Sequence, residues 1–177
     1  MVHYTLFPTA IGQCGIAWQD EVIVATQLPE RNPKETTERL VAKSGATKGA
    51  PRAKIQAAIE AMTTLLEGNK TDLRHISCDL SGVSPFAREV YHITRAIPAG
   101  ETKTYGDVAG ELGDKQLAQK VGRELGRNPL PIIVPCHRVL GANYQLTGFS
   151  AHGGVETKLQ MLMIEGARFS DQPGLFD

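Results

Sequence analysis

The five residues Pro135–Val139, in the order Pro-Cys-His-Arg-Val, carry the side chains best suited to chemistry. A cysteine is a weak nucleophile as a thiol and a strong one as a thiolate, so a nearby base can activate it. His137 is such a base, and because sequence neighbours need not touch, a water molecule could relay the proton from Cys136. The run therefore predicts a nucleophilic cysteine, with a core histidine and a solvated or phosphate-pairing charge as the plainer alternatives for His137 and Arg138.

Three prolines brace the segment ahead of this cysteine. Pro129, Pro131 and Pro135 flank the apolar run Ile132–Val134. Each proline ring fixes its own φ and biases the preceding residue away from helix, so we expect a stiff, extended segment that gives the thiol little freedom. Asn128, which comes directly before the first of these prolines, has the plainer interpretation of a residue that ends a helix.

Glu165 lies in the last turn of a predicted helix, Glu156–Glu165, which Gly166 would end. The helix dipole disfavours an anion at that end by up to ~1 kcal/mol. Because this penalty is small, a solvated helix end is the plainer interpretation. A tertiary partner such as His137 is the alternative.

The helices that position these residues are predicted from caps and apolar spacing. Ser84-Pro85 is a capping hydroxyl followed by proline, and it precedes a helical stripe over Phe86–Ile97. Two more helices, Tyr105–Leu112 and Lys115–Arg127, are joined by the turn Gly113-Asp114. Such a pair is a candidate helix-turn-helix, although many helix pairs of this kind bind nothing.

Residues 1–80 have the pattern of a separate α+β unit, and residues 82–177 form the second predicted domain. Short runs with β-type composition, bounded by turn residues, predict strands at Tyr4–Phe7, Gly15–Trp18, Val22–Thr26 and Ile76–Leu80. Helical spacing predicts helices over Pro33–Ser44 and Ala53–Leu66. Nothing in this first unit carries obvious chemistry, so the second domain is expected to hold the site.

Composition limits the function classes. The 19 basic residues balance 19 acidic ones, which indicates modest binding if DNA is the partner. No apolar run approaches the ~20 residues that span a bilayer, and the first residues do not have the pattern of a signal peptide, so we expect a cytoplasmic protein. Three scattered cysteines and five histidines show no paired spacing, so we expect no disulfide and no metal, and Cys14 and Cys78 as inert core residues.

In order along the chain, these features resemble one family, the O6-alkylguanine-DNA alkyltransferases, also called methylated-DNA–protein-cysteine methyltransferases. The resemblance is strong over residues 82–167 and only outlined over residues 1–80. It implies a small N-terminal sheet with helices, ribonuclease H-like in outline, packed on a mainly helical domain with a helix-turn-helix. The matching strings are Arg127–Val139, Leu146–Ser150, Gly153-Gly154, Lys158, Glu165-Gly166, Ile97–Thr102 and Thr104–Gly106.

The resemblance implies repair of alkylated guanine in DNA by irreversible, stoichiometric transfer of the alkyl group to Cys136, with O4-alkylthymine left open as a second substrate. His137 would act as the base through a water, and Glu165 would orient and stabilise its imidazole. Asn128 would hold the local backbone, and Tyr105 would supply a proton or hydrogen bond to the leaving oxygen. The thioether product has no proton to lose, so each molecule would act once, and the reaction would need no cofactor.

The resemblance also implies that the target base is flipped out of the duplex by a helix-turn-helix in the minor groove. Relatives usually carry an arginine at the position of Gln119, and glutamine lacks that charge and planar fork. Because residues 101–138 hold a basic excess of one, we expect weak binding with a shallow salt dependence. The residues expected to contact substrate or DNA are Thr104, Ala118, Gln119, Gly122, Arg138, Ser150 and Lys158.

Three other functions compete with this transferase. A lesion-binding protein that flips alkylguanine and recruits repair proteins would lack an alkyl acceptor, whereas Cys136 is present. A cysteine hydrolase would need an evident third triad member. A plain helix-turn-helix regulator would be more basic and would not need the braced cysteine. We therefore expect a monomeric alkyltransferase that acts on double-stranded DNA and binds no membrane.

Overall fold

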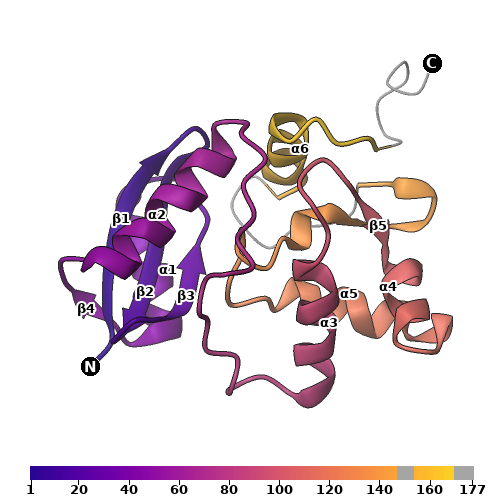
Figure 1. The fold of residues 1–177 in the computed structure, drawn as a ribbon, viewed down its shortest axis with the longest axis horizontal. Helices are drawn as coiled ribbons and strands as arrows, with labels where there is room; N and C mark the ends of the chain where they lie inside the picture. The colour runs from indigo at the N-terminus through magenta and orange to yellow at the C-terminus, as the bar shows by residue number, and fades with distance from the viewer. Residues whose placement is uncertain (147–153, 170–177) are drawn as a thin grey trace.

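A four-stranded sheet forms the first half of the computed structural model, which describes residues 1–146 and 154–169 (Figure 1). The strands are β1 (His3–Thr9), β2 (Gly12–Gln19), β3 (Val22–Gln27) and β4 (Thr47–Lys48), in the order β3-β2-β1-β4. Strands β1 to β3 pair antiparallel, and the short β4 runs parallel to β1. The three strands predicted in residues 4–26 are confirmed.

The predicted strand Ile76–Leu80 is wrong, because the segment makes only an isolated bridge between Cys78 and Ile23 of β3. The backbone hydrogen bonds there are Ile23 N–H to the Ser77 carbonyl (3.0 Å) and Asp79 N–H to the Ile23 carbonyl (2.9 Å). The segment therefore covers the outer edge of β3 at one point without extending the sheet. The fourth strand is instead β4, which is too short to give an alternating pattern.

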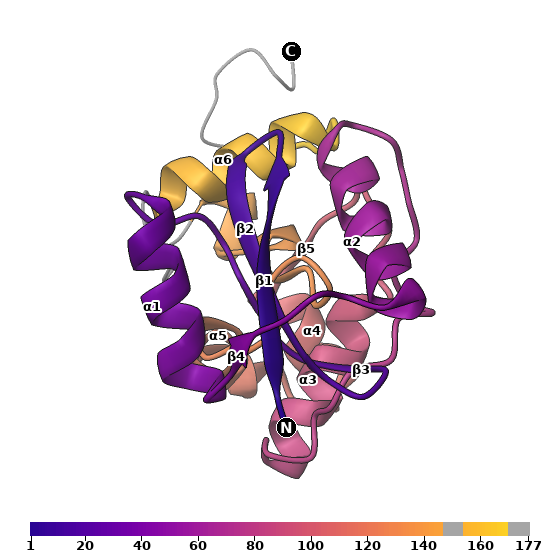
Figure 2. The ribbon, with the colours of Figure 1, turned by 90° about the vertical axis from the view of Figure 1, so that its left-hand side faces the viewer.

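Helices α1 (Pro33–Ser44) and α2 (Ala53–Leu66) lie on opposite faces of the sheet, as Figure 2 shows. Alternation along β2 explains this arrangement, since successive side chains point to opposite faces. Ala17 packs with Leu40 of α1, whereas Ile16 belongs to the core that includes α2. Both helices have the bounds predicted from the sequence.

The second half is mainly helical, and one helix differs in part from its prediction. The segment Lys115–Arg127 was expected to be a single helix but begins with a 3-10 turn, Lys115–Leu117. The predicted cap at Ser84 is present, with its hydroxyl accepting from the Ala87 N–H. The elements are α3 (Pro85–Arg95), β5 (Lys103–Thr104), α4 (Tyr105–Glu111), α5 (Ala118–Gly126), β6 (Val139–Leu140) and α6 (Val155–Ile164), with further 3-10 turns at Cys136–Arg138 and Ala142–Tyr144.

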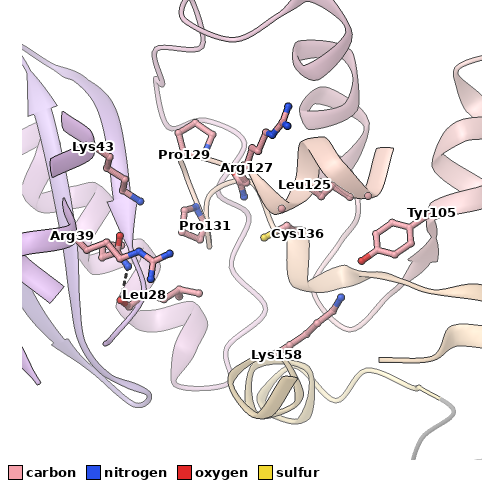
Figure 3. A pocket seen from close by; sticks show the side chains of 14 residues that line it. Leu28, Arg39, Lys43, Tyr105, Leu125, Arg127, Pro129, Pro131, Cys136 and Lys158 are labelled. Atoms are coloured by element: carbon pink, nitrogen blue, oxygen red, sulfur yellow. Dashed lines mark hydrogen bonds between the residues drawn. The ribbon is translucent and has the colours of Figure 1, made fainter. Parts of the chain in front are cut away.

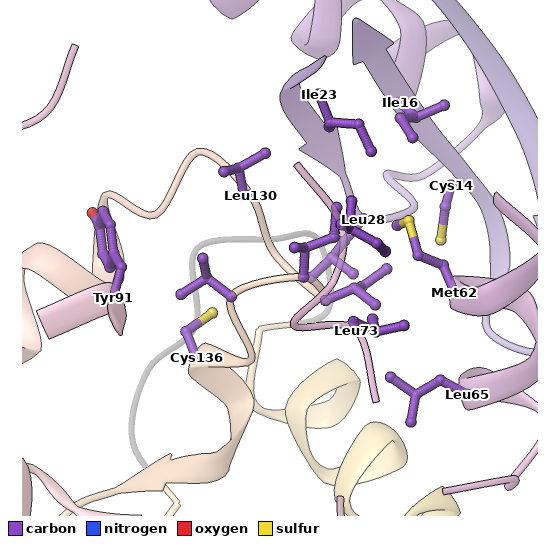
Figure 4. Packing of buried hydrophobic residues seen from close by; sticks show 14 of the residues in the cluster. Cys14, Ile16, Ile23, Leu28, Met62, Leu65, Leu73, Tyr91, Leu130 and Cys136 are labelled. Carbon is purple, nitrogen blue, oxygen red and sulfur yellow. The ribbon is translucent and has the colours of Figure 1, made fainter. Parts of the chain in front are cut away.

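One continuous apolar core joins the two halves (Figure 4). It runs from Cys14 and Met62, between the sheet and α2, to Leu130 and Cys136 beside α3 and α5. The segment that carries the cysteine is therefore packed against the sheet. The boundary near residue 81, the helix-turn-helix character of α4 and α5, and the ribonuclease H-like outline stay predictions.

None of the helices in the described ranges is long and apolar enough to cross a membrane. Within the same residues, no three side chains of His, Cys, Asp or Glu are grouped so that they could hold a metal ion.

Candidate active site

A cavity of about 300 Å³ opens where α1, α5 and α6 meet, and Cys136 forms part of its wall (Figure 3). This size is at the lower end of the range for small-molecule sites. The cavity brings together residues that lie far apart in the sequence. Five of the sequence-predicted site residues line it: Tyr105, Gly122, Asn128, Cys136 and Lys158.

Asn128 organises the segment that leads to the cysteine. Its side-chain oxygen accepts from the Leu130 N–H (2.9 Å), and its amide nitrogen donates to the Val134 carbonyl (2.8 Å). The Val134 carbonyl also accepts from the Cys136 N–H (2.7 Å) across Pro135, whose φ of −79° and ψ of 67° are those of an inverse γ-turn. Because the proline ring already fixes φ near this value, the turn that presents the thiol is preorganised.

Backbone strain lies within the same segment. Ile132 has a φ of 77°, in the left-handed region that a β-branched side chain rarely adopts. Such a conformation costs roughly 1–3 kcal/mol and persists only where the surroundings determine it. The extended segment expected from the prolines is thus sharply bent at Ile132. This bend lies four residues before the thiol.

Opposing effects act on the pKa of the Cys136 thiol. Burial raises its pKa above the ordinary value, whereas a hydrogen bond with the Asn128 side chain and the positive charge of Lys158 oppose the rise. The Cys136 side chain remains 8% exposed and lines the cavity. An incoming electrophile can therefore reach the sulfur, and removal of the thiol proton needs a base close by.

His137 and Arg138, the two residues that follow the cysteine in the sequence, form a buried network with Glu165. Glu165 Oε1 lies 3.0 Å from His137 Nε2 and 2.9 Å from Arg138 Nε, and Glu165 Oε2 lies 2.7 Å from the terminal Nη2 of Arg138. Arg138 also donates to the Ile97 carbonyl (2.6 Å). The partner expected for Glu165 at its helix end is therefore present, together with a second one, the Arg138 guanidinium.

The network fixes the protonation of the imidazole. Burial alone would raise the pKa of Glu165, but the charges and hydrogen bonds of His137 and Arg138 outweigh it and lower that pKa to about 2. Burial lowers the pKa of His137, against the opposing effect of Glu165. A carboxylate can only accept, so a neutral His137 carries its proton on Nε2. Its Nδ1, buried and without a hydrogen-bond partner among the residues that the structure describes, is then left as the proton acceptor.

Lys158 provides a buried cation at the opposite wall of the cavity. Its side chain is 1% exposed, and its Nζ donates to the Val139 carbonyl (2.8 Å) and lies 5.8 Å from the centre of the Tyr105 ring. Burial lowers the pKa of Lys158 to about 8. The positive charge of Lys158 lowers the pKa of Cys136 and so favours the thiolate over the thiol.

The other residues predicted to contact substrate or DNA do not line the cavity or lie outside the described residues. Thr104 caps α4 next to Tyr105, and Ala118 and Gln119 begin α5 outside the cavity wall. Arg138 is buried against Glu165, so the predicted contact of Arg138 with DNA is not supported by its position. Ser150 lies outside the described residues.

Sequence reasoning missed the part of the cavity wall that comes from the first half of the chain. In Figure 3, Arg39 and Lys43 extend from α1 toward Cys136, on the side away from Tyr105. Gln27 and Leu28, at the end of β3, complete this wall. No local pattern marks these four residues, because only the packing of the two halves brings them to the site.

Comparison with known proteins shows what the chain is similar to. Residues 85–167 match the family described as "6-O-methylguanine DNA methyltransferase, DNA binding domain". A methylated-DNA–protein-cysteine methyltransferase of Mycobacterium tuberculosis is 32% identical over 177 residues, covering 100% of both chains. The corresponding protein of Salmonella typhimurium is 48% identical over 86 residues, about half of each chain.

Solved structures agree with these relatives. The crystal structure of the Mycobacterium tuberculosis O6-methylguanine methyltransferase matches all of this chain with a TM-score of 0.78 and 32% identity. A structure of the Mycobacterium tuberculosis protein in complex with DNA matches 99% of each chain, with a TM-score of 0.76 and 31% identity. Because the full length of the chain is matched in both sequence and fold, it belongs to the family of methylated-DNA–protein-cysteine methyltransferases.

Proposed function

We propose that this chain removes alkyl groups from O6 of guanine in duplex DNA and keeps them as a thioether on Cys136. The observation that carries the proposal is that Cys136 lines a cavity of about 300 Å³ while the imidazole of the next residue, His137, is buried against the Glu165 carboxylate at 3.0 Å. The family membership places the chain among DNA repair methyltransferases. The residues described above supply the chemistry.

The transfer is an in-line displacement at the alkyl carbon. The sulfur of Cys136 forms a bond to that carbon as the bond from carbon to O6 breaks. The thiol proton passes to Nδ1 of His137, directly or through one water, and Glu165 stabilises the resulting imidazolium. The departing guanine takes a proton from the hydroxyl of Tyr105, which lines the same cavity. The proton on His137 then restores the tyrosine through solvent.

The product explains why the reaction is expected to be stoichiometric. A thioether has no proton to release, so Cys136 cannot become a thiolate again. None of these steps needs a cofactor. An alkyl carbon on O4 of thymine could meet the same sulfur, so the proposal includes O4-alkylthymine as a second substrate.

DNA binding is assigned to α4 and α5. Gly122 of α5 faces the Tyr105 ring, which a Cβ at that position would meet at 3.9 Å. Gly122 therefore keeps the cavity wall beside the Tyr105 ring open. Ala118, at the start of α5 and outside that wall, is the small residue that would let the helix approach a sugar-phosphate backbone closely, which suits recognition by shape. The flipped base would enter the cavity between this helix and Lys158. The target is therefore duplex DNA that contains alkylated guanine.

The test is intact-mass spectrometry after incubation with a duplex that contains O6-methylguanine, followed by peptide mapping. We expect a gain of one methylene unit per molecule, on the peptide that contains Cys136. A gain at any other residue, or release of the methyl group with repeated turnover, would contradict the proposal. Duplex DNA with unmodified guanine is the control.

A further inference from the structure

The outer edge of strand β3 is joined to the segment that carries the nucleophile, and Thr26 makes the connection. Its backbone N–H donates to the Pro129 carbonyl (3.1 Å), and its hydroxyl donates to the Pro131 carbonyl (2.7 Å). Thr26 is 0% exposed, and 105 residues separate it from Pro131 in the sequence. Both halves of the chain therefore meet in two buried hydrogen bonds.

The carbonyls that accept from Thr26 belong to two prolines, which limits how this segment can be anchored. A proline has no N–H, so its carbonyl is the only backbone group that it can use to anchor the chain. A buried carbonyl without a donor is costly, which gives the Thr26 hydroxyl a defined energetic role. Asn128 holds the other side of the segment through Leu130 and Val134.

The strained residue lies between these two sets of contacts. Ile132, with its φ of 77°, directly follows Pro131, and its side chain is buried. A strained backbone keeps its conformation only while neighbouring contacts hold it. Asn128 contacts the residues before and after the bend, and Thr26 contacts the residue at which the bend begins.

We propose that Thr26 is a positioning residue for Cys136, and that the N-terminal sheet serves as the scaffold that holds the nucleophile segment in its strained conformation. This proposal rests on the proposed function in one respect: the effect of losing the Thr26 hydroxyl is measured as a change in the rate of alkyl transfer. A side chain of β3 thereby controls the position of a sulfur in the other half of the molecule.

The key variant is Thr26→Val, which keeps the shape and the strand preference of the residue and removes the hydroxyl. It leaves the Pro131 carbonyl without its donor, so the bend at Ile132 can relax. A displacement of about 1 Å in a reacting group can cost ~10²-fold in rate. We therefore expect single-turnover alkyl transfer from O6-methylguanine duplex to slow by about 10- to 100-fold, while the Kd for the duplex changes less than about twofold.

Two further variants separate positioning from stability. Thr94→Val is the matched control, because Thr94 is also 0% exposed and donates at 2.7 Å to a carbonyl, that of Val90, but within α3. The Val90 carbonyl keeps the helical N–H of residue 94 as its donor, so this variant should fold and should transfer alkyl groups at the wild-type rate. Thr26→Ser keeps the hydroxyl and should restore the wild-type rate, which tests the proposal even if Thr26→Val does not fold.

A second readout does not depend on DNA. The rate at which iodoacetamide alkylates Cys136, followed by peptide mapping across pH, reports the thiol itself. We expect its pH profile to shift in Thr26→Val and to stay unchanged in Thr94→Val and Thr26→Ser. Equal transfer rates and equal profiles in wild type and Thr26→Val, or a slow Thr26→Ser, would overturn the role of Thr26. If the wild type accepts no alkyl group from DNA but its iodoacetamide profile still depends on Thr26, the proposed function fails and the positioning role stands.

Discussion

The surroundings of Cys14 and Cys136 predict an inert thiol in one region of the molecule and a reactive thiol in the other. Cys14 is 0% exposed within the sheet core and Cys136 is 8% exposed, so burial alone separates them little. Burial raises the pKa of Cys14 to about 12, and a hydrogen bond with the Thr9 hydroxyl, 3.6 Å away, opposes this rise. The Asn128 side chain and the Lys158 cation act on the Cys136 thiol, and Cys136 also lines a cavity. The two thiols therefore differ in their polar partners and in the presence of a cavity at Cys136, and only slightly in exposed fraction.

The sharpest way to break this comparison is to remove each thiol in turn. Cys136→Ala should abolish alkyl uptake completely while binding to alkylated duplex persists, because the cavity and the helices remain. Cys14→Ala should retain full uptake and lower the free energy of unfolding by about 1 kcal/mol, the usual size of a small core truncation. Intact-mass spectrometry and thermal unfolding measure the two outcomes. Alkyl uptake by Cys136→Ala would show that another residue is the acceptor.

The next largest effect is expected from the carboxylate behind Cys136. Glu165→Gln leaves the Arg138 guanidinium buried without its counter-charge, which costs about 3–5 kcal/mol of stability. It also removes the charge that stabilises a protonated His137, so transfer should slow by about 10²-fold. Glu111→Gln, at a surface pair with Lys103, is the control and should change stability by less than about 1 kcal/mol. A wild-type transfer rate in Glu165→Gln would remove the carboxylate from the mechanism.

Because of the lowered pKa of Glu165, we expect the free energy of unfolding to fall at acidic pH. The pKa of Glu165 falls from 4.5 to about 2 on folding, so the unfolded chain binds the proton more readily. Its contribution is fully present above about pH 4.5 and is lost as the pH falls toward 2. Chemical denaturation at a series of pH values should show this loss in the wild type and a flatter limb in Glu165→Gln.

A smaller effect is expected from Lys158, the cation that Cys14 lacks. Its pKa falls from 10.5 to about 8 on folding, so stability should rise as the pH increases between those values. Lys158→Met should remove that rise and increase stability at pH 7 by up to about 3 kcal/mol, offset in part by the lost hydrogen bond to Val139. Transfer should slow by about tenfold, equivalent to about 1.4 kcal/mol in the barrier. Faster transfer in this variant would show that the cation does not assist the sulfur.

Sequence reasoning succeeded where a local pattern carries the information. Helical spacing predicted the positions of α1 and α2, and the Ser84 cap with apolar spacing predicted that of α3. The Pro-Cys-His-Arg-Val run pointed to Cys136, which lies on the cavity wall, and its role as nucleophile stays a prediction. Sequence reasoning failed for the short strand β4, because two residues give no alternation, and for Ile132, because nothing local forces a positive φ on isoleucine. Arg138 was placed at a surface because an arginine is usually exposed, whereas Glu165 holds it inside.

The part of the cavity wall that comes from α1 and β3 could not be predicted from a single sequence either. Arg39 and Lys43 are spaced as surface residues of a helix, and Thr26 is an ordinary strand residue. Their roles depend on how the sheet packs against residues 128–136, which is a property of the whole fold. Contacts between distant segments, such as the one between Thr26 and Pro131, leave no periodic signal.

The smallest effect is expected at Gln119, in the first turn of α5 and outside the cavity wall. If this position fills the space of the flipped base, Gln119→Arg should tighten binding to alkylated duplex by about threefold, since a planar cation stacks and hydrogen-bonds better than an amide. Binding to unmodified duplex should then change less, and the salt dependence should stay the same. If the new arginine instead pairs with a phosphate, both duplexes should bind more tightly and the salt slope should steepen by about 0.9. Titrations of both duplexes at several salt concentrations distinguish base replacement from simple charge pairing, and the second result would place Gln119 beside the backbone instead of inside the duplex.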